Sequence, residues 1–264
     1  MNEYVQILIL AVVQGVAEFL PISSKGHLVI VEQMLGAFSG GHSIAQGKQV
    51  EVFLHLGTLG SIVVVYARNL WRLRRDFRLC AILVAATFPA GIVGVLFEDW
   101  FDEAFDSPIL AGYGLLITAG LLTTAHWLER GRFNEQTIPW VSAMIIGCFQ
   151  AVALIPGVSR SGSTISAGLL VGMEREAATR FSFMLAVPVT AGAILLTALR
   201  AWEDSSLTLG PGPLAVGVVV SFLVGCASLE ALIRLVVRGK LHWFAVYCAI
   251  AGCATIAWCA LGNG

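Results

Sequence analysis

The sequence has 264 residues, of which 57% are hydrophobic and only 12% are charged, and its mean hydropathy is +0.83. This composition lies outside the range of ordinary soluble domains and indicates an integral membrane protein. The formal net charge is −1, so we expect no basic surface for nucleic acid. The apolar runs leave little polar sequence between them, and we therefore expect a single membrane domain over residues 1–264.

Six apolar runs are long enough for spanning helices, which need about 20 residues each. They cover residues 51–67, 80–97, 108–128, 177–200, 213–236 and 242–261. The sequence before them lacks the basic start and the cleavage site of a signal peptide, so we expect it to belong to the fold.

Two further apolar stretches, about 4–36 and 138–172, are interrupted at their centres by Pro, Gly and Ser. Irregular backbone at membrane depth is tolerated only where it is buried in protein or lines a wet cavity. We therefore expect two re-entrant helical hairpins, which makes the fold an all-α polytopic membrane protein with six transmembrane helices. The alternative is one or two ordinary spanning helices with a kink.

The two interrupted stretches resemble each other. QGVAEFLPISSKGH (14–27) and QAVALIPGVSRSGST (150–164) share a leading Gln, Val-Ala two residues on, a proline, and a serine pair with a cation. Each precedes three expected spans, so we predict an internal repeat with halves of about 1–128 and 138–261. Because three is odd, the second half is inverted, and such repeats share a site near the bilayer midplane.

The charges of the expected loops predict the orientation. Residues 68–79 contain five arginines, whereas residues 98–106 contain five acidic residues and no cation. The positive-inside rule places the first loop in the cytoplasm and the second outside. The alternation continues with Arg130 and Arg132 inside, Glu203 and Asp204 outside, and Arg238 and Lys240 inside. Both termini then lie outside, the first hairpin enters from outside, and the second enters from the cytoplasm.

Ionisable and hydroxyl side chains gather at the two interruptions, and ionisable groups in membrane segments mark functional sites by default. They are Glu18, Lys25, His27 and Arg160, accompanied by Ser23, Ser24, Ser159, Ser161, Ser163 and Thr164. A Ser-rich turn before a helix offers backbone N–H groups and the positive end of the helix dipole, which favour phosphate. The Arg160 guanidinium can hold two phosphate oxygens at once. The sequence thus predicts a phosphate or diphosphate site.

The spacing of these residues suggests their roles. Ser24 and His27 lie three apart at an expected helix start, so His27 can orient or deprotonate Ser24. Gln14 and Glu18 lie four apart on one helix face. Glu18 is therefore a candidate for binding Mg²⁺ or for general acid/base catalysis.

Structural roles are the alternatives for the same residues. Hydroxyls often join helices in membranes, and Lys25 can extend to the outer surface. His27 can be a packed histidine, and Glu18 with Arg160 can be a structural ion pair. His55, four residues after Glu51, can line the mouth of the cavity or lie at the membrane interface, and we do not expect it to be catalytic.

The two motifs resemble those of the undecaprenyl-diphosphate phosphatase family, the bacitracin-resistance membrane phosphatases of bacteria. The first family motif is matched by Gln14, Glu18, Pro21, Ser23, Ser24, Gly26 and His27. The second is matched by Pro156, Gly157, Ser159, Arg160, Ser161, Gly162 and Thr164. Gln14 stands where many relatives have a glutamate, which leaves Glu18 as the only acidic group of its motif.

The resemblance implies hydrolysis of undecaprenyl diphosphate to undecaprenyl phosphate and inorganic phosphate with a divalent cation, which we expect to be Mg²⁺ held by Glu18. This reaction recycles the carrier lipid of cell-wall synthesis and confers bacitracin resistance. The resemblance also implies a multi-pass protein of the bacterial inner membrane whose site opens to the periplasm. The expected partners are the polyprenyl diphosphate and membrane lipid, and a homodimer is left open.

In the predicted mechanism Ser24 attacks the terminal phosphate, His27 or Glu18 is its base, and Arg160 stabilises the developing charge. Water or His27 as the attacking group stays an alternative. The expected substrate-binding residues are Gln14, Ser23, Gly157, Ser159, Ser161, Gly162 and Thr164. The alternative function is a polyprenyl-phosphate flippase or transporter, because paired re-entrant hairpins in an inverted repeat are also a transporter architecture.

Overall fold

The computed structural model describes residues 2–38, 48–97, 100, 101, 104, 107–203 and 209–263. Over these residues the regular structure is helical, with one isolated β-bridge between Phe133 and Met173. The helices are α1 (Glu3–Ala17), α2 (Ser24–Phe38), α3 (Lys48–Val65), α4 (Ala67–Leu73), α5 (Phe77–Leu96), α7 (Pro108–Leu128), α8 (Trp140–Val152), α9 (Arg160–Leu170), α10 (Arg175–Glu203), α11 (Pro211–Val237) and α12 (Leu241–Trp258). A π-helical turn, Cys259–Asn263, follows α12. The acidic residues of the 98–106 loop and Asp204 lie outside the described residues.

Each of the six predicted spans corresponds to a helix. Within the described residues, α5, α7, α10, α11 and α12 with its following turn are long and apolar enough to cross a bilayer. The sixth, α3, passes the same test only together with α4, and the two are bent by 76° at their junction. The chain is therefore a polytopic membrane protein. The described residues contain five or six candidate crossings, and the expected number of six stays a prediction.

The predicted loop over 68–79 is wrong in its first half, because these residues form α4. Leu70 and Leu73, three residues apart on one helix face, pack against the apolar core, while Arg72 is exposed. The five arginines of residues 68–79 indicate a loop in the sequence, although Leu70 and Leu73 have the spacing of one helix face.

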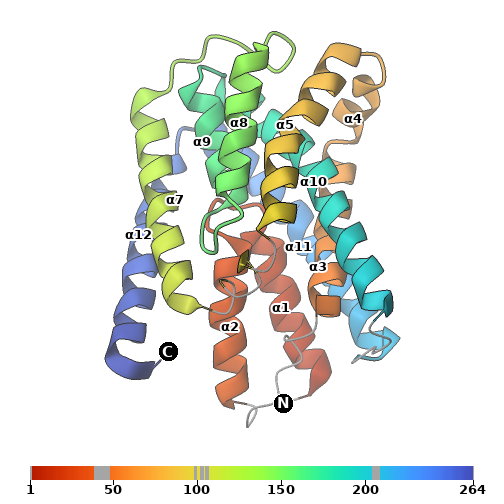
Figure 1. The fold of residues 1–264 in the computed structure, drawn as a ribbon, viewed down its shortest axis with the longest axis vertical. Helices are drawn as coiled ribbons and strands as arrows, with labels where there is room; N and C mark the ends of the chain where they lie inside the picture. The colour runs from red at the N-terminus through yellow and green to blue at the C-terminus, as the bar shows by residue number, and fades with distance from the viewer. Residues whose placement is uncertain are drawn as a thin grey trace.

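Each interrupted stretch forms a helical hairpin with its tip near the middle of the molecule (Figure 1). The open ends of α1 and α2 lie at the end of the molecule where both termini lie, whereas α8 and α9 open toward the opposite end, where α4 also lies. The hairpins thus enter the helix bundle from opposite ends, the arrangement that an inverted repeat requires. Their re-entry into a bilayer stays a prediction.

The breaks between the hairpin arms follow from residues that cannot continue a helix. After α1, Pro21 lacks an N–H group, and Ser23 adopts a φ of 69°, in the left-handed region. After α8, Gly157 adopts a φ of 81°. Ser159 then caps α9, and its Oγ accepts the Gly162 N–H at 3.1 Å. Both tips therefore end in a Ser-led helix start.

The two tips are in direct contact. A Cβ added at Gly26 would lie 3.3 Å from the Cα of Gly157, and one added at Gly162 would lie 3.2 Å from the Cβ of Pro21. The second tip also presses on α7, because a Cβ at Gly114 would lie 2.0 Å from the carbonyl oxygen of Pro156. Small residues are thus required where the two halves of the chain meet.

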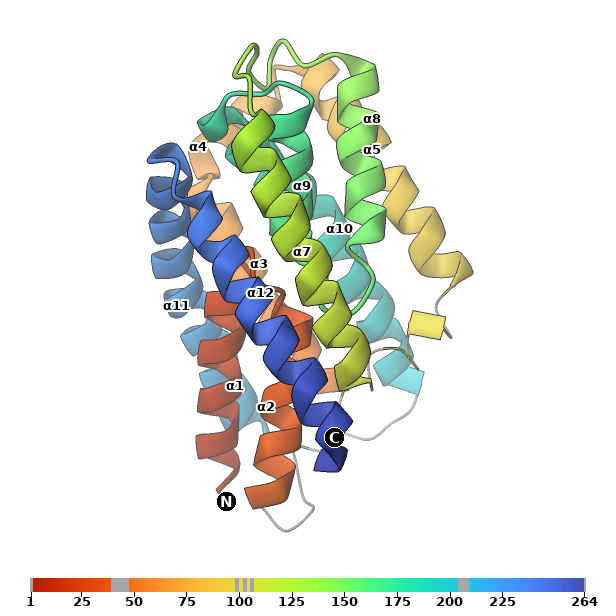
Figure 2. The same ribbon diagram turned by 90° about the vertical axis from the view of Figure 1, so that its left-hand side faces the viewer.

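Helix packing follows the same two-fold pattern. α1 packs against α11, and its counterpart α8 packs against α5, the counterpart of α11. α3 contacts its own counterpart α10, and α7 runs beside its counterpart α12 (Figure 2). This reciprocal packing is what two repeats of one hairpin and three helices would produce.

The larger apolar core lies around the hairpin tips. Phe19, just after α1, packs on Phe183 of α10 with ring centroids 5.7 Å apart, and Tyr66 stacks on the same Phe183 at 6.0 Å. Outside this core, large apolar side chains such as Phe88 and Ile92 of α5 are exposed on the surface. An apolar outer surface is expected of helices that face lipid.

Two glycines of α7 provide a test of the tip contact. Gly114→Ala should lower the free energy of unfolding by about 1–3 kcal/mol or more, because the added methyl meets a backbone oxygen that has no room to move. Gly120→Ala, in open space on the same helix, should be neutral or stabilising by up to about 1 kcal/mol. The measurement is thermal unfolding of both variants in detergent, and equal midpoints would contradict the packing described.

Candidate active site

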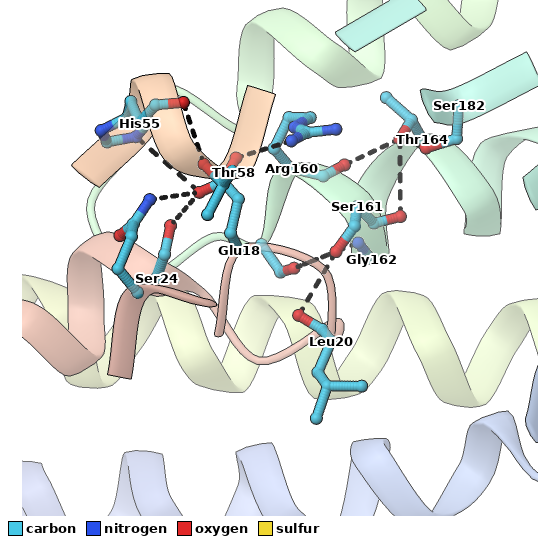
Figure 3. Close-up of polar contacts among 12 residues, drawn as sticks. Glu18, Leu20, Ser24, His55, Thr58, Arg160, Ser161, Gly162, Thr164 and Ser182 are labelled. Atoms are coloured by element: carbon cyan, nitrogen blue, oxygen red, sulfur yellow. Dashed lines mark hydrogen bonds and ion pairs between the residues drawn. The ribbon is translucent and has the colours of Figure 1, made fainter. Parts of the chain in front are cut away.

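Glu18 lies at the centre of the site, one residue after the end of α1, with a side chain only 9% exposed. Its Oε2 accepts hydrogen bonds from Gln14 Nε2 at 3.1 Å and from Ser24 Oγ at 2.8 Å. Its Oε1 accepts from Arg160 Nη2 at 2.7 Å (Figure 3). Both hairpins therefore converge on one buried carboxylate.

Arg160, the first residue of α9, uses only half of its guanidinium for this ion pair. Its Nη1 is buried without a hydrogen-bond partner, and its Cζ lies 5.7 Å from the centre of the Phe183 ring. Because a buried N–H group costs free energy when it is unpaired, the Nη1 edge is suited to a ligand. Glu18 and Arg160 form the ion pair named as the structural alternative, and they line a cavity as well.

His55 of α3 is the third ionisable group at the carboxylate. Its Nε2 lies 3.7 Å from Glu18 Oε2, and its Nδ1 donates to the carbonyl oxygen of Glu51 at 2.8 Å. From the sequence, His55 is expected at the cavity mouth or at the membrane interface, without a catalytic role, and in the structure it lines the cavity. A histidine within an apolar span is the sequence feature that could have indicated a site residue. Its partner is Glu18 at the end of α1, and no local spacing in the sequence links the two.

The predicted contact between Ser24 and His27 is not formed. Ser24 donates to Glu18, whereas His27 Nδ1 donates to the carbonyl oxygen of Ser23 at 2.8 Å and its Nε2 lies 2.6 Å from the Oη of Tyr247 in α12. The ring therefore folds back on its own turn and packs against α12. Of the two bases predicted for Ser24, only Glu18 contacts it, and a catalytic role of His27 stays a prediction.

Ser23 holds the first tip in its unusual conformation. It is the only residue other than glycine with a positive φ among the described residues, and its Oγ accepts the Gly26 N–H at 3.3 Å. Such strained positions persist only where the surroundings fix them, and they cluster at functional sites. The strain directs the chain so that Ser24 begins α2 facing Glu18.

Several hydroxyl groups of the second hairpin form hydrogen bonds with other groups of the protein. Ser161 Oγ donates to the carbonyl oxygen of Leu20 at 3.3 Å, and Thr164 Oγ1 bonds Ser182 Oγ at 2.5 Å (Figure 3). Ser159 lines the cavity while its hydroxyl caps α9. Neither Ser161 nor Thr164 lines the cavity, so the geometry gives these two predicted binding residues a supporting position. Gly157, Gly162 and Gln14 are not among the lining residues either, although Gln14 contacts Glu18, which is one of them.

A cavity of about 150 Å³ brings the site residues together. It is lined by Glu18, Ser23, Ser24, His55, Ser159 and Arg160, with Lys25 and Gln150 also at its wall. Lys25 is half-exposed and lies 3.5 Å from the Glu51 carboxylate, so it pairs beside the cavity. The cavity is thus rich in hydrogen-bond donors around a single carboxylate.

Two apolar cavities continue from this polar one along α5 and α10. The nearer, of about 320 Å³, shares Lys25, Leu154, Val189 and Ala193 with the polar cavity. The farther, of about 580 Å³, shares Thr87, Gly91, Val95 and Pro188 with the nearer one. Each cavity thus shares lining residues with the next, and together the two form a path lined mostly by apolar residues, which we call the α5–α10 groove, that ends beside the Glu18 cavity.

The buried ion pair should contribute more to stability than an exposed one. Arg160→Ala should cost about 3–5 kcal/mol of unfolding free energy, because it leaves the Glu18 carboxylate buried without its cation. Arg234→Ala removes the exposed pair with Glu230 on α11 and should cost at most about 1 kcal/mol. Thermal or denaturant unfolding in detergent measures both, and similar losses would show that Glu18 has other compensation.

Comparison with known proteins agrees with the geometry. The family model described as bacitracin resistance protein BacA matches residues 7–254. The undecaprenyl-diphosphatase of Rhodopirellula baltica is 42% identical over 96% of both chains. Undecaprenyl-diphosphatase 2 of Bacillus thuringiensis is 37% identical over 94% of this chain and 95% of its own, and the undecaprenyl-diphosphatase of Desulfatibacillum aliphaticivorans is 32% identical over 96% and 98%. The chain belongs to the BacA family of bacitracin resistance proteins.

Proposed function

We propose that this protein is a membrane phosphatase that hydrolyses undecaprenyl diphosphate to undecaprenyl phosphate and inorganic phosphate. The observation that carries the proposal is the contact of Ser24 with Glu18 and of Glu18 with Arg160 at the wall of one buried cavity. The names of the curated relatives support the same substrate. The reaction would return the carrier lipid to cell-wall synthesis and so confer bacitracin resistance.

Ser24 and Glu18 supply a nucleophile and a base. The Ser24 hydroxyl already donates to the Glu18 carboxylate at 2.8 Å, the geometry that an activated serine needs. In the first step Ser24 Oγ bonds the terminal phosphorus, Glu18 takes the hydroxyl proton, and the bond to the bridging oxygen breaks to release undecaprenyl phosphate. Water then attacks the phosphorus of the phosphoserine, the bond from phosphorus to Ser24 Oγ breaks, and Glu18 returns its proton to Ser24 Oγ, while inorganic phosphate leaves with the oxygen and protons of the water.

Arg160 would stabilise the charge that develops on the transferred phosphoryl group. Its Nη1 is unpaired, and Arg160 lines the cavity at the N-terminus of α9, where the helix dipole also favours an anion. Phosphoryl transfer depends mainly on positioning and charge neutralisation, so the guanidinium supplies what this chemistry requires.

A divalent cation fits beside Glu18. The described residues contain no group of three His, Cys, Asp or Glu side chains that could hold a metal alone. However, Gln14 Oε1 is buried without a partner next to Glu18, and one carboxylate with one amide oxygen suits Mg²⁺ when phosphates supply further ligands. A cation held there would neutralise phosphate charge.

The α5–α10 groove supports a lipid substrate, because it leads away from the polar site along apolar side chains. A prenyl chain placed there stays out of water while its diphosphate reaches Ser24. The arginine-rich α4 region lies at the end opposite the termini (Figure 1), which under the positive-inside rule supports an orientation in the inner membrane with the first hairpin toward the periplasm.

The alternative of a flippase or transporter has weaker support. The three relatives compared above are named as diphosphatases and none as a transporter. A carrier needs a binding site but no nucleophile, whereas Ser24 contacts a carboxylate base directly.

Ser24→Ala tests the nucleophile. Phosphate release from farnesyl or undecaprenyl diphosphate by purified protein with Mg²⁺ should fall by about 10³-fold or more, because no other group takes over the covalent step. Thr124→Ala, which removes an exposed hydroxyl of α7, is the control and should keep full turnover. Substantial turnover by Ser24→Ala would instead favour water as the attacking group.

A larger side chain in the α5–α10 groove tests whether the prenyl chain binds there. Gly91→Leu adds a side chain in open space at the wall shared by both apolar cavities. It should lower kcat/KM for undecaprenyl diphosphate about tenfold or more, and that for the five-carbon dimethylallyl diphosphate much less, because only the long chain reaches this position. Gly120→Leu, in open space on α7, should change neither value. Equal losses for both substrates would place the chain elsewhere.

A further inference from the structure

Gln150 of α8 is an unexplained polar group in the membrane domain. Its side chain is 1% exposed, and neither its Nε2 nor its Oε1 has a hydrogen-bond partner. The great majority of buried polar side-chain atoms in proteins are paired, and an unpaired amide in a low-dielectric interior costs free energy. A group kept at such a cost calls for a partner from outside the chain.

The position of Gln150 shows where that partner would lie. Gln150 lines the same cavity as Glu18, Ser24 and Arg160. Arg160 Nη1 is also buried without a partner. Two residues of the second hairpin, each with a buried unpaired donor, one neutral and one cationic, therefore line a cavity whose carboxylate is already bonded by three other groups.

The internal repeat explains why the amide is unpaired. Gln150 corresponds to Gln14, whose Nε2 donates to Glu18 four residues later. Four residues after Gln150 stands Leu154, which also lines the cavity and offers no acceptor. The second hairpin thus keeps the glutamine without the carboxylate that satisfies its counterpart in the first.

We propose that Gln150 is a substrate-binding residue whose Nε2 donates to a non-bridging oxygen of the lipid diphosphate while Arg160 Nη1 donates to another. The proposal rests on the proposed function for its substrate. An amide is suited to this role because it donates hydrogen bonds without adding charge, and its Oε1 can accept from water or from a protonated phosphate oxygen. In this proposal Gln150 and the Nη1 edge of Arg160 bind the phosphate oxygens together.

The first experiment is kinetic. Gln150→Met keeps the size of the side chain and removes both polar atoms. With farnesyl diphosphate as substrate, KM should rise about tenfold to a hundredfold with kcat much less affected, because a hydrogen bond to a charged phosphate is lost in the bound state. The unfolding midpoint of the free protein should be unchanged or higher, since no internal hydrogen bond is removed.

Ser166→Ala is the matched control. Ser166 Oγ is another buried polar atom without a partner, on α9, but Ser166 does not line the cavity. This variant should leave KM unchanged. An unchanged KM in Gln150→Met would overturn the proposal and leave buried water as the partner of the amide. A lower unfolding midpoint with unchanged KM would assign Gln150 to the scaffold.

Binding separates this proposal from the proposed function. In the Ser24→Ala background, the dissociation constant of farnesyl diphosphate should rise about tenfold or more when Gln150→Met is added, and Ser166→Ala should not change it. If the wild-type protein releases no phosphate but binding still depends on Gln150, the hydrolytic function fails and this inference stands. If the wild-type protein hydrolyses the substrate but binding does not depend on Gln150, the hydrolytic function stands and this inference fails. If Gln150→Met does not fold, Gln150→Glu serves instead, and its carboxylate should weaken binding further by repelling phosphate.

Discussion

The buried ion pair between Glu18 and Arg160 is the interaction on which the rest of the structure depends. The two residues are separated by 142 positions in the chain and are contributed by hairpins that enter from opposite ends. Neither charge is tolerated at this depth without the other, so the pair forms only when both tips meet. Gly26 and Gly157 permit that approach because their backbones lie within contact distance. Assembly of the two halves and formation of the site are therefore one event.

The two hairpins of the predicted repeat have similar helical arrangements and different chemistry. Ser24 and Arg160 occupy equivalent positions as the first residues of α2 and α9, each following a serine at the tip. Both bond to the same carboxylate, one as a hydroxyl and one as a cation. Glu18 itself is replaced by Leu154 in the second half. A near-symmetric fold can thus place a nucleophile, a base and a cation around one point, because the substitutions between the halves are unequal.

Much of this arrangement could be predicted from the sequence, because Pro, Gly and Ser interrupt apolar runs for local reasons. The six long helices, both hairpins and the convergence of the two motifs follow from such patterns. Contacts set by tertiary packing could not be predicted. Local spacing suggested that His27 serves Ser24, but its ring meets Tyr247, 220 residues away. The role of His55 near Glu18 depends on how α3 lies against the first tip, which no local pattern encodes.

A fold of this kind does not by itself distinguish hydrolysis from transport, and the distinction rests on how firmly the site is held. A carrier must open its site to each side in turn, which here would separate the tips and expose the Glu18–Arg160 pair. That movement would break the Glu18–Arg160 hydrogen bond and the close contacts at the glycines of the two tips. Catalysis of phosphoryl transfer gains from the same rigidity, because donors fixed in advance need no reorganisation when charge develops. The features that oppose alternating access therefore favour a stationary site, which agrees with the proposal that a lipid reaches it through the α5–α10 groove.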